Sequence, residues 1–172
     1  MTEDLQYPIG RFKAPVVVEP LQLEQWIDEI AATPGRVREA VGGLSVEQLD
    51  TPYRAGGWTG RQVVHHLADS HLNAYVRFRL ALTEDEPMIK PYDESRWAEL
   101  SDARSAPIEP SLELLDGLHA RWVSLMRNLS PADWRRRFRH PQRDVLSLAH
   151  DAGLYAWHGR HHVAHIMALR TL

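Results

Sequence analysis

Four segments of the chain place apolar residues at the spacing of an amphipathic helix, and this pattern restricts the fold more than any other feature. The segments cover about residues 21–41, 60–82, 110–129 and 148–169. Apolar side chains recur in each at helical intervals, so each helix has one face to bury. Four long helices with short accessory pieces predict an all-α fold, a four-helix bundle.

Residues that start or stop helices stand at the ends of these segments. Thr59 followed by Gln62 has the pattern of a capping box at the start of the second segment. Ser45 and Gln48 have the same pattern before a short helical turn. Pro34 is expected to kink the first helix or to divide it in two.

The remaining segments predict short accessory structure. Residues 1–20 are rich in proline and show no sustained period, so we expect an extended arm laid over the domain. The connection over residues 83–109 should contain at most one short helix, near residues 93–100. A helical turn is expected after Ser130, and residues 138–148 should be irregular or form a small hairpin.

Composition excludes several classes of function. The formal net charge of −3 provides no broad basic field for nucleic acid or an anionic membrane surface. No window reaches the ~18–20 apolar residues of a membrane-spanning helix. The N-terminus lacks the features of a signal peptide, so we expect a cytoplasmic protein with one domain, residues 1–172. Because the chain has no cysteine, any metal must be held by nitrogen and oxygen ligands.

Within the last helical segment, the stretch WHGRHHVAHI carries four histidines, which raises the question of a metal site. His158 with His162, and His161 with His165, are pairs four residues apart on one helix face. At about 100° per residue, the first pair points more directly toward the apolar face, and His161 is expected at the surface. Such pairs also arise by chance among ten histidines, and a metal ion needs a third protein ligand.

The second helical segment offers candidates for that third ligand in HHLADSH. His71 lies in the middle of the apolar face, so we expect a packed core histidine with one hydrogen-bond partner. His65 and His66 flank the face on opposite sides at similar angles. His66 is favoured because its side of the helix carries small neutral polar residues, namely Thr59, Gln62, Ser70 and Asn73.

Other polar residues are secondary candidates. Asp69, His65 and His165 could orient the ligand imidazoles or move protons, and of these we propose Asp69 and His165 as candidates for a catalytic role. Asp116 and His119 form a D-x-x-H pattern, but a di-iron bundle needs further inward carboxylates that the sequence lacks.

Several stretches carry a resemblance to a known family: YPIGRF, LDTPYRAGGWTGRQVVHHLADSH, KPYDESRW, LHARW and GLYAWHGRHHVAHI. With them the chain resembles the DinB superfamily, and more closely its bacillithiol-transferase-like branch of YfiT-type metal-dependent hydrolases. The resemblance implies a four-helix bundle that holds one divalent ion, zinc or nickel, through three histidines, and it implies a homodimer. His66, eight residues after Trp58, and the pair His158 and His162 stand at the matching positions.

Three histidine ligands would leave one coordination position open, as in catalytic metal sites. The first hypothesis is a hydrolase that activates a metal-bound water on a small substrate. An alternative is an S-transferase for a low-molecular-weight, bacillithiol-like thiol, with a metal-bound thiolate as nucleophile. A further alternative is a non-enzymatic, stress-related metal-binding bundle. Pocket walls are expected from the 83–109 connection, the arm and the loop around Trp58.

Overall fold

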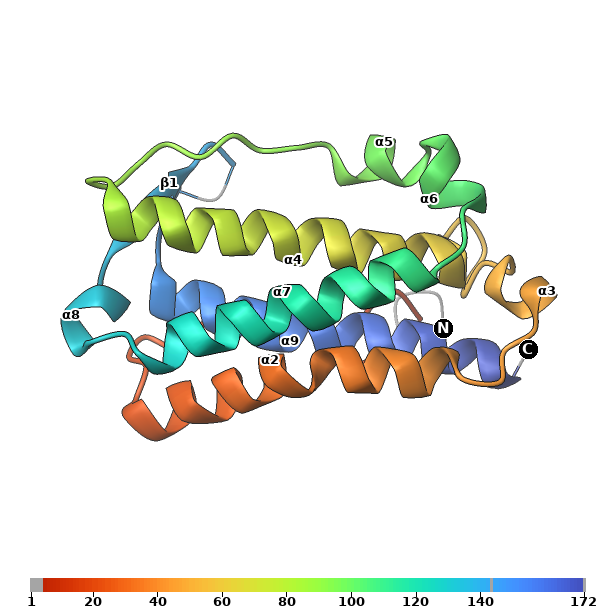
Figure 1. The fold of residues 1–172 in the computed structure, drawn as a ribbon, viewed down its shortest axis with the longest axis horizontal. Helices are drawn as coiled ribbons and strands as arrows, with labels where there is room; N and C mark the ends of the chain where they lie inside the picture. Colours follow the sequence, from red (N-terminus) through yellow and green to blue (C-terminus); the bar gives the residue numbers. More distant parts are fainter. Residues whose placement is uncertain (1–4, 143, 172) are drawn as a thin grey trace.

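The computed structural model describes residues 5–142 and 144–171, and in these ranges four long helices lie side by side along the molecule (Figure 1). They are α2 (Pro20–Val41), α4 (Gly60–Thr83), α7 (Glu109–Arg127) and α9 (Leu148–Ala168). The predicted four-helix bundle is confirmed. Among the described residues, none of the helices combines the length and the apolar character needed to cross a membrane.

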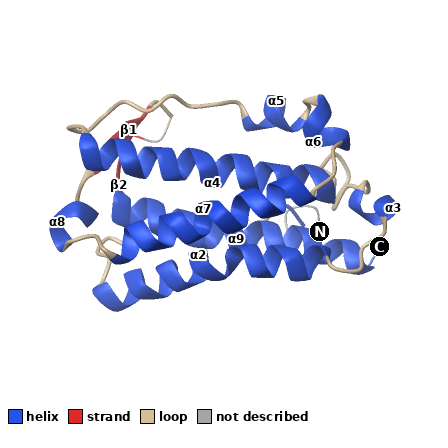
Figure 2. Cartoon of the chain, in the orientation of Figure 1, coloured by secondary structure: helices blue, strands red, loops and turns tan. Residues whose placement is uncertain are grey.

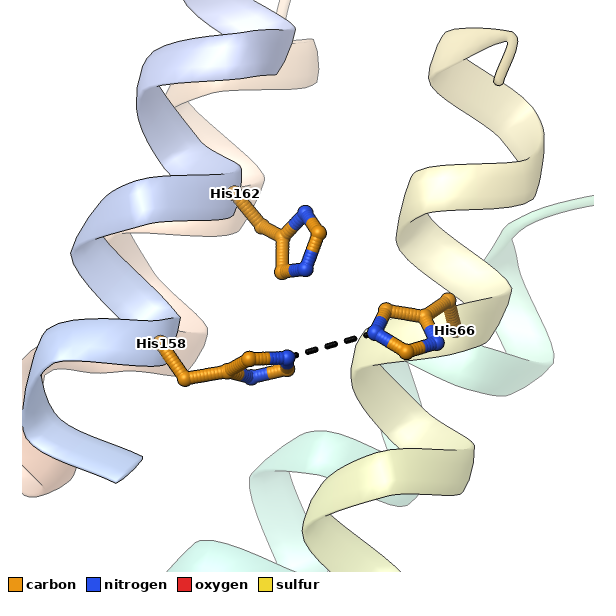
Figure 3. A group of neighbouring side chains, drawn as sticks. All are labelled: His66, His158 and His162. Carbon is orange, nitrogen blue, oxygen red and sulfur yellow. Dashed lines mark hydrogen bonds between the residues drawn. The ribbon is translucent and has the colours of Figure 1, made fainter. Parts of the chain in front are cut away.

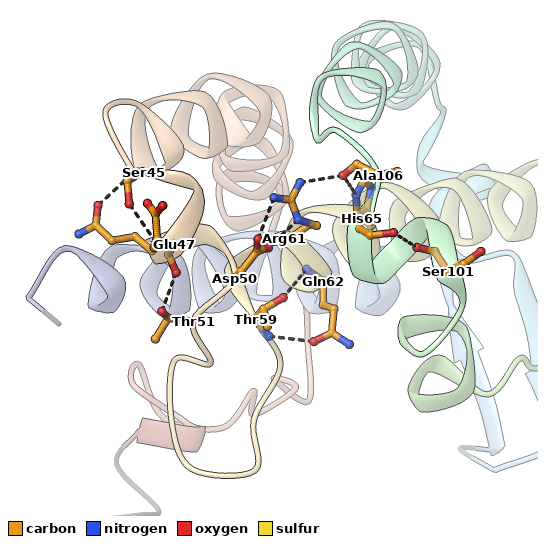
Figure 4. A network of polar contacts seen from close by, with 12 residues as sticks. Ser45, Glu47, Asp50, Thr51, Thr59, Arg61, Gln62, His65, Ser101 and Ala106 are labelled. Atoms are coloured by element: carbon orange, nitrogen blue, oxygen red, sulfur yellow. Dashed lines mark hydrogen bonds and ion pairs between the residues drawn. The ribbon is translucent and has the colours of Figure 1, made fainter.

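Helix α4 begins with the capping box that its sequence predicts. The Thr59 side chain accepts a hydrogen bond from the backbone N–H of Gln62 at 3.2 Å, and the Gln62 side chain accepts one from the Thr59 N–H at 2.9 Å (Figure 4). Ser45 and Gln48 form the same motif before α3 (Val46–Leu49). Helix α2 is not divided at Pro34, which is buried within it.

Replacing Thr59 with alanine is expected to lower the free energy of unfolding by about 1 kcal/mol, because one N–H group at the start of α4 loses its acceptor. Urea denaturation followed by circular dichroism measures this change. Thr83→Ala, at the exposed end of the same helix, is the matched control and should change stability by less than about 0.5 kcal/mol. Equal losses in the two variants would contradict a specific contribution from the cap.

Helices α2 and α9 approach closely because α9 presents glycines to α2. A Cβ atom at Gly153 would lie 2.7 Å from the ring of Trp26. A Cβ atom at Gly159 would lie 2.7 Å from Thr33 Oγ1. Any larger residue at these two positions would therefore push the helices apart.

The buried apolar residues form two groups, one toward each end of the bundle. The first is built around Phe78, Trp122 and Phe138, and the second around Leu67, Leu115 and Ile166. Each long helix also buries a polar residue near the place where the two groups meet: Thr33 of α2, His71 of α4, His119 of α7 and His162 of α9.

The accessory elements are short, and most of them belong to the segments that connect one long helix to the next along the chain. The hairpin predicted within residues 138–148 is present, although residue 143 lies outside the described residues. Its strands β1 (Arg137–His140) and β2 (Asp144–Ser147) pair antiparallel, with Phe138 opposite Leu146 (Figure 2). The helical turn after Ser130 is α8 (Pro131–Trp134), and a 3-10 turn, η1 (Leu169–Thr171), follows α9.

The 83–109 connection contains more helix than its sequence predicts. It forms α5 (Glu94–Ala98), which Asp93 caps, and also α6 (Ser101–Ser105). The expectation of at most one short helix is wrong. Helix α6 has no side-chain cap, but it buries Ala103 and packs against α4. Tertiary packing therefore stabilises a helix that carries only a weak local signal.

The N-terminal arm lies against α9 through three hydrogen bonds to backbone carbonyls. His165 Nε2 donates to the Gln6 carbonyl at 3.2 Å, and the indole N–H of Trp157 donates to the Gly10 carbonyl at 3.0 Å. His150 Nε2 donates to the Pro15 carbonyl at 2.9 Å. Residues 1–4 of the predicted arm lie outside the described residues.

Candidate metal site and cavity

His66, His158 and His162 meet between α4 and α9 (Figure 3). The Nε2 atoms of His66 and His158 are 3.2 Å apart. The ring centroid of His162 lies 4.8 Å from that of His66 and 4.5 Å from that of His158. One ligand nitrogen from each residue lies within 4.8 Å of the other two. The structure thus brings together the three residues that the sequence proposes as ligands.

The spacing of these nitrogens fits a divalent transition metal. Zinc binds imidazole nitrogen at about 2.0–2.1 Å with tetrahedral angles, which puts two ligand nitrogens about 3.3–3.4 Å apart. The 3.2 Å between the Nε2 atoms of His66 and His158 is close to that value. Imidazole ligands suit zinc and nickel, whereas calcium and magnesium prefer oxygen.

Burial favours the neutral form of His66 and His162 near pH 7. It lowers the pKa of His66 to about 4, with smaller contributions from the charges of His161 and His165. Burial also lowers the pKa of His162 well below its ordinary value, and the neighbouring histidines add to this effect. A neutral imidazole has one ring nitrogen without a proton, and this is the form that binds a metal ion.

His161 and His165 of the same helix are also buried. The expected surface position of His161 is wrong, because the side chain is only 6% exposed. Trp157 stacks on its ring at 4.5 Å, and Tyr7 of the arm lies 5.8 Å away. His161, His162 and His165 form a second group of histidines whose nitrogens lie within 4.8 Å of one another.

His71 and His119 lie behind the site, and both are buried in the bundle. The core position predicted for His71 is confirmed, but the single hydrogen-bond partner is wrong. His71 Nδ1 is 2.9 Å from His119 Nε2, and His71 Nε2 is 3.2 Å from His158 Nδ1. The connection of His119 to the site was missed, although its spacing from Leu115 and Trp122 places it on the inward face of α7.

Asp69 and His65 lie away from the three histidines. Burial, followed by the charge of Asp102, raises the pKa of Asp69 to about 6. His65 contacts Ser111 at 2.8 Å and the Ala106 carbonyl at 3.3 Å. Neither residue lines the cavity beside His66, so the structure does not bring the proposed candidate Asp69 to the site.

A cavity of about 460 Å³ opens beside the histidines. The arm, the loop around Trp58 and the 83–109 connection all contribute to its walls, as predicted, and the hairpin contributes as well. Its polar side includes Arg77 and Ser70, which each donate a hydrogen bond to the Tyr155 hydroxyl at 3.4 Å. A cavity of this volume is large enough for a small organic substrate.

A family model for the DinB superfamily matches residues 29–166 of the chain. The chain belongs to the DinB superfamily. The superfamily resemblance recognised in the sequence is thereby confirmed.

Curated DinB-type relatives match over nearly their whole length. One from Oceanobacillus iheyensis is 53% identical over 164 residues, covering 95% of each protein. One from Bacillus mycoides is 52% identical over 168 residues, covering 98% of this chain and 96% of the relative. Both carry the provisional name metal-dependent hydrolase.

A solved structure of the same type agrees with the fold. YfiT from Bacillus subtilis is 47% identical, with a TM-score of 0.95 over 98% of this chain and 97% of its own. It is described as a "probable metal-dependent hydrolase with an unusual four-helix bundle topology". These names, together with the histidine cluster, support a metal-dependent enzyme of the DinB superfamily.

Proposed function

We propose that this chain is a metal-dependent hydrolase of a small substrate, in which His66, His158 and His162 hold one zinc or nickel ion. The observation that carries the proposal is the convergence of three imidazoles at the wall of a 460 Å³ cavity. Three protein ligands leave a position open, and an ion held in this way supplies a Lewis acid that activates a nucleophile near neutral pH.

The cavity residues around the site would position and shield the substrate. Burial, followed by the charge of Asp151, raises the pKa of Tyr155, so its hydroxyl stays protonated and can donate a hydrogen bond. The buried guanidinium of Arg77 adds a positive charge to the same wall. Tyr7 and Trp157 pack on His161 at the cavity wall, where they would reduce the access of bulk water from the side of the arm.

The second candidate is an S-transferase that joins a low-molecular-weight thiol to an electrophile. Two observations favour it. The chain has no cysteine, so a thiol nucleophile would have to be a diffusible co-substrate. The cavity has room for more than a water molecule beside the three histidines. The two candidates thus share one site and differ in the nucleophile.

One experiment distinguishes the candidates. Zinc-loaded and nickel-loaded protein are each incubated with a panel of esters and amides, and separately with a haloaromatic electrophile plus assorted thiols. We expect metal-dependent hydrolysis that falls to background in His162→Ala and persists in His150→Gln, whose residue lies on the same helix but outside the cavity. Thiol conjugation without hydrolysis would favour the transferase, and no turnover in either panel would favour a non-enzymatic, stress-related metal-binding bundle.

A further inference from the structure

The ligand histidines of α9 each hydrogen-bond to another histidine through Nδ1. His158 Nδ1 lies 3.2 Å from His71 Nε2, and His162 Nδ1 lies 3.3 Å from His165 Nδ1. A neutral imidazole carries one proton and binds metal through the other nitrogen. The location of the proton on each ring therefore decides which nitrogen can face the ion.

In the first chain of hydrogen bonds, one carbonyl determines every proton position. The Ile30 carbonyl of α2 can only accept, and it lies 2.7 Å from His119 Nδ1, so His119 carries its proton there. His119 Nε2 must then accept from His71 Nδ1 at 2.9 Å. His71 Nε2 in turn accepts from His158 Nδ1, which leaves Nε2 of His158 unprotonated and directed at His66.

The second chain of hydrogen bonds is shorter and starts in the N-terminal arm of the protein. The Gln6 carbonyl accepts from His165 Nε2 at 3.2 Å, so His165 Nδ1 has no proton. His165 Nδ1 then accepts from His162 Nδ1 at 3.3 Å. His162 is left with an unprotonated Nε2, as His158 is, although the two chains run through different parts of the fold.

Both chains of hydrogen bonds require neutral imidazole rings, which carry a single proton. Burial in the bundle favours the neutral ring. His71 is fully buried, and His119 and His165 are each 2% exposed. In the described part of the protein, their hydrogen bonds go to imidazoles and carbonyls rather than to a carboxylate that would stabilise a charged ring.

We propose that His119 acting through His71, and His165 acting directly, are positioning residues that place the proton on Nδ1 of His158 and His162. The carbonyls of Ile30 and Gln6 are the fixed acceptors at which the two chains end. The proposal rests on the metal site proposed above. It also assigns a role to the arm, whose attachment through Gln6 keeps a ligand in its metal-binding tautomer.

The proton positions can be measured without any metal. In long-range ¹H–¹⁵N NMR spectra of ¹⁵N-labelled, metal-free protein near neutral pH, we expect Nδ1–H tautomers for His71, His119, His158 and His162. We expect the Nε2–H tautomer for His165. A proton on Nε2 of His71 or of His162 would overturn the proposal, whether or not the protein later proves to be an enzyme.

Variants then test whether the chains affect the site. His119→Leu and His165→Leu are each expected to weaken zinc binding by about 10–100-fold in chelator competition. His150→Leu is the matched control, because His150 also donates to an arm carbonyl but contacts neither ligand. The His150→Leu variant should keep the dissociation constant for zinc within about twofold of the wild-type value, a change well below 10–100-fold.

A spectroscopic change separates positioning from a general loss of structure. Without His119 to accept from it, His71 Nδ1–H loses its partner, and the opposite tautomer of the ring donates toward His158 instead. We therefore expect metal-free His119→Leu to show His158 with a substantial Nε2–H population. If His158 keeps its proton on Nδ1 in this variant and zinc affinity is unchanged, the proposed role of His119 is wrong.

Discussion

His66→Ala is expected to abolish high-affinity zinc binding, whereas His65→Ala should retain it. His66, on the opposite helix, supplies the nitrogen that lies 3.2 Å from His158 Nε2. Without His66 only two of the three proposed ligands remain, and both lie on α9. The loss should exceed the roughly 10–100-fold that follows removal of an outer hydrogen-bond partner. His65 bonds to Ser111 and to the Ala106 carbonyl instead, so its removal leaves all three ligands in place.

The measurement is the zinc content of protein purified without a histidine tag, determined by mass spectrometry. Circular dichroism checks that each variant is folded. Retention of zinc in His66→Ala with loss in His161→Ala would show that the second histidine group, His161, His162 and His165, holds the ion. Loss in His65→Ala with retention in His66→Ala would contradict the assignment on α4.

The metal-free protein is expected to lose stability as the pH falls from about 6.5 to about 4. Burial lowers the pKa of His66 from 6.5 to about 4, so the unfolded chain binds this proton more readily than the folded one. A difference of 2.5 pKa units corresponds to roughly 3 kcal/mol at 1.36 kcal/mol per unit. The loss begins near the pKa of the unfolded state and is complete below that of the folded state.

Asp69 opposes this trend, because burial raises its pKa to about 6 in the folded protein. A carboxyl group with a raised pKa stabilises the folded state at low pH, and this contribution is lost as the pH rises through 6. Its side chain is only half-buried, so solvent screens the effect and the histidine contribution should dominate.

Urea denaturation between pH 7 and pH 4, in the presence of a chelator, measures this dependence. His66→Phe removes the titrating ring and should make the decline in stability shallower. Zinc-loaded protein should be more stable at pH 7 and should lose the added stability as protons compete for the same nitrogens. Equal pH dependence in the wild-type protein and in His66→Phe would contradict the buried, neutral state of His66.

Much of the fold could be predicted because helix periodicity and capping are local properties. Residues 60–82 were predicted for the second long helix, and α4 covers Gly60–Thr83 with the expected cap at Thr59. Helix α6 was missed because it is five residues long and depends on packing against α4. The continuity of α2 through Pro34 likewise depends on burial in the bundle, which local propensity does not describe.

The candidate site could be predicted in part. The periodicity of α9 directs His158 and His162 inward, and the polar neighbours of His66 distinguish it from His65. The same helical periodicity predicts a surface position for His161. That prediction assumes that only the other helices of the bundle can cover a helix face. The arm, which is far away in sequence, covers His161 with Tyr7.

The sequence by itself determined the four helices, the inward pair on the last of them and, through the absence of cysteine, the nitrogen and oxygen chemistry of any metal site. Only the tertiary structure decided which histidines meet across helices and which carbonyls accept hydrogen bonds from them. The physical reason is that periodicity orients a side chain about its own helix axis. Contacts between His119 and His71, or between His165 and Gln6, depend on the offset between packed segments.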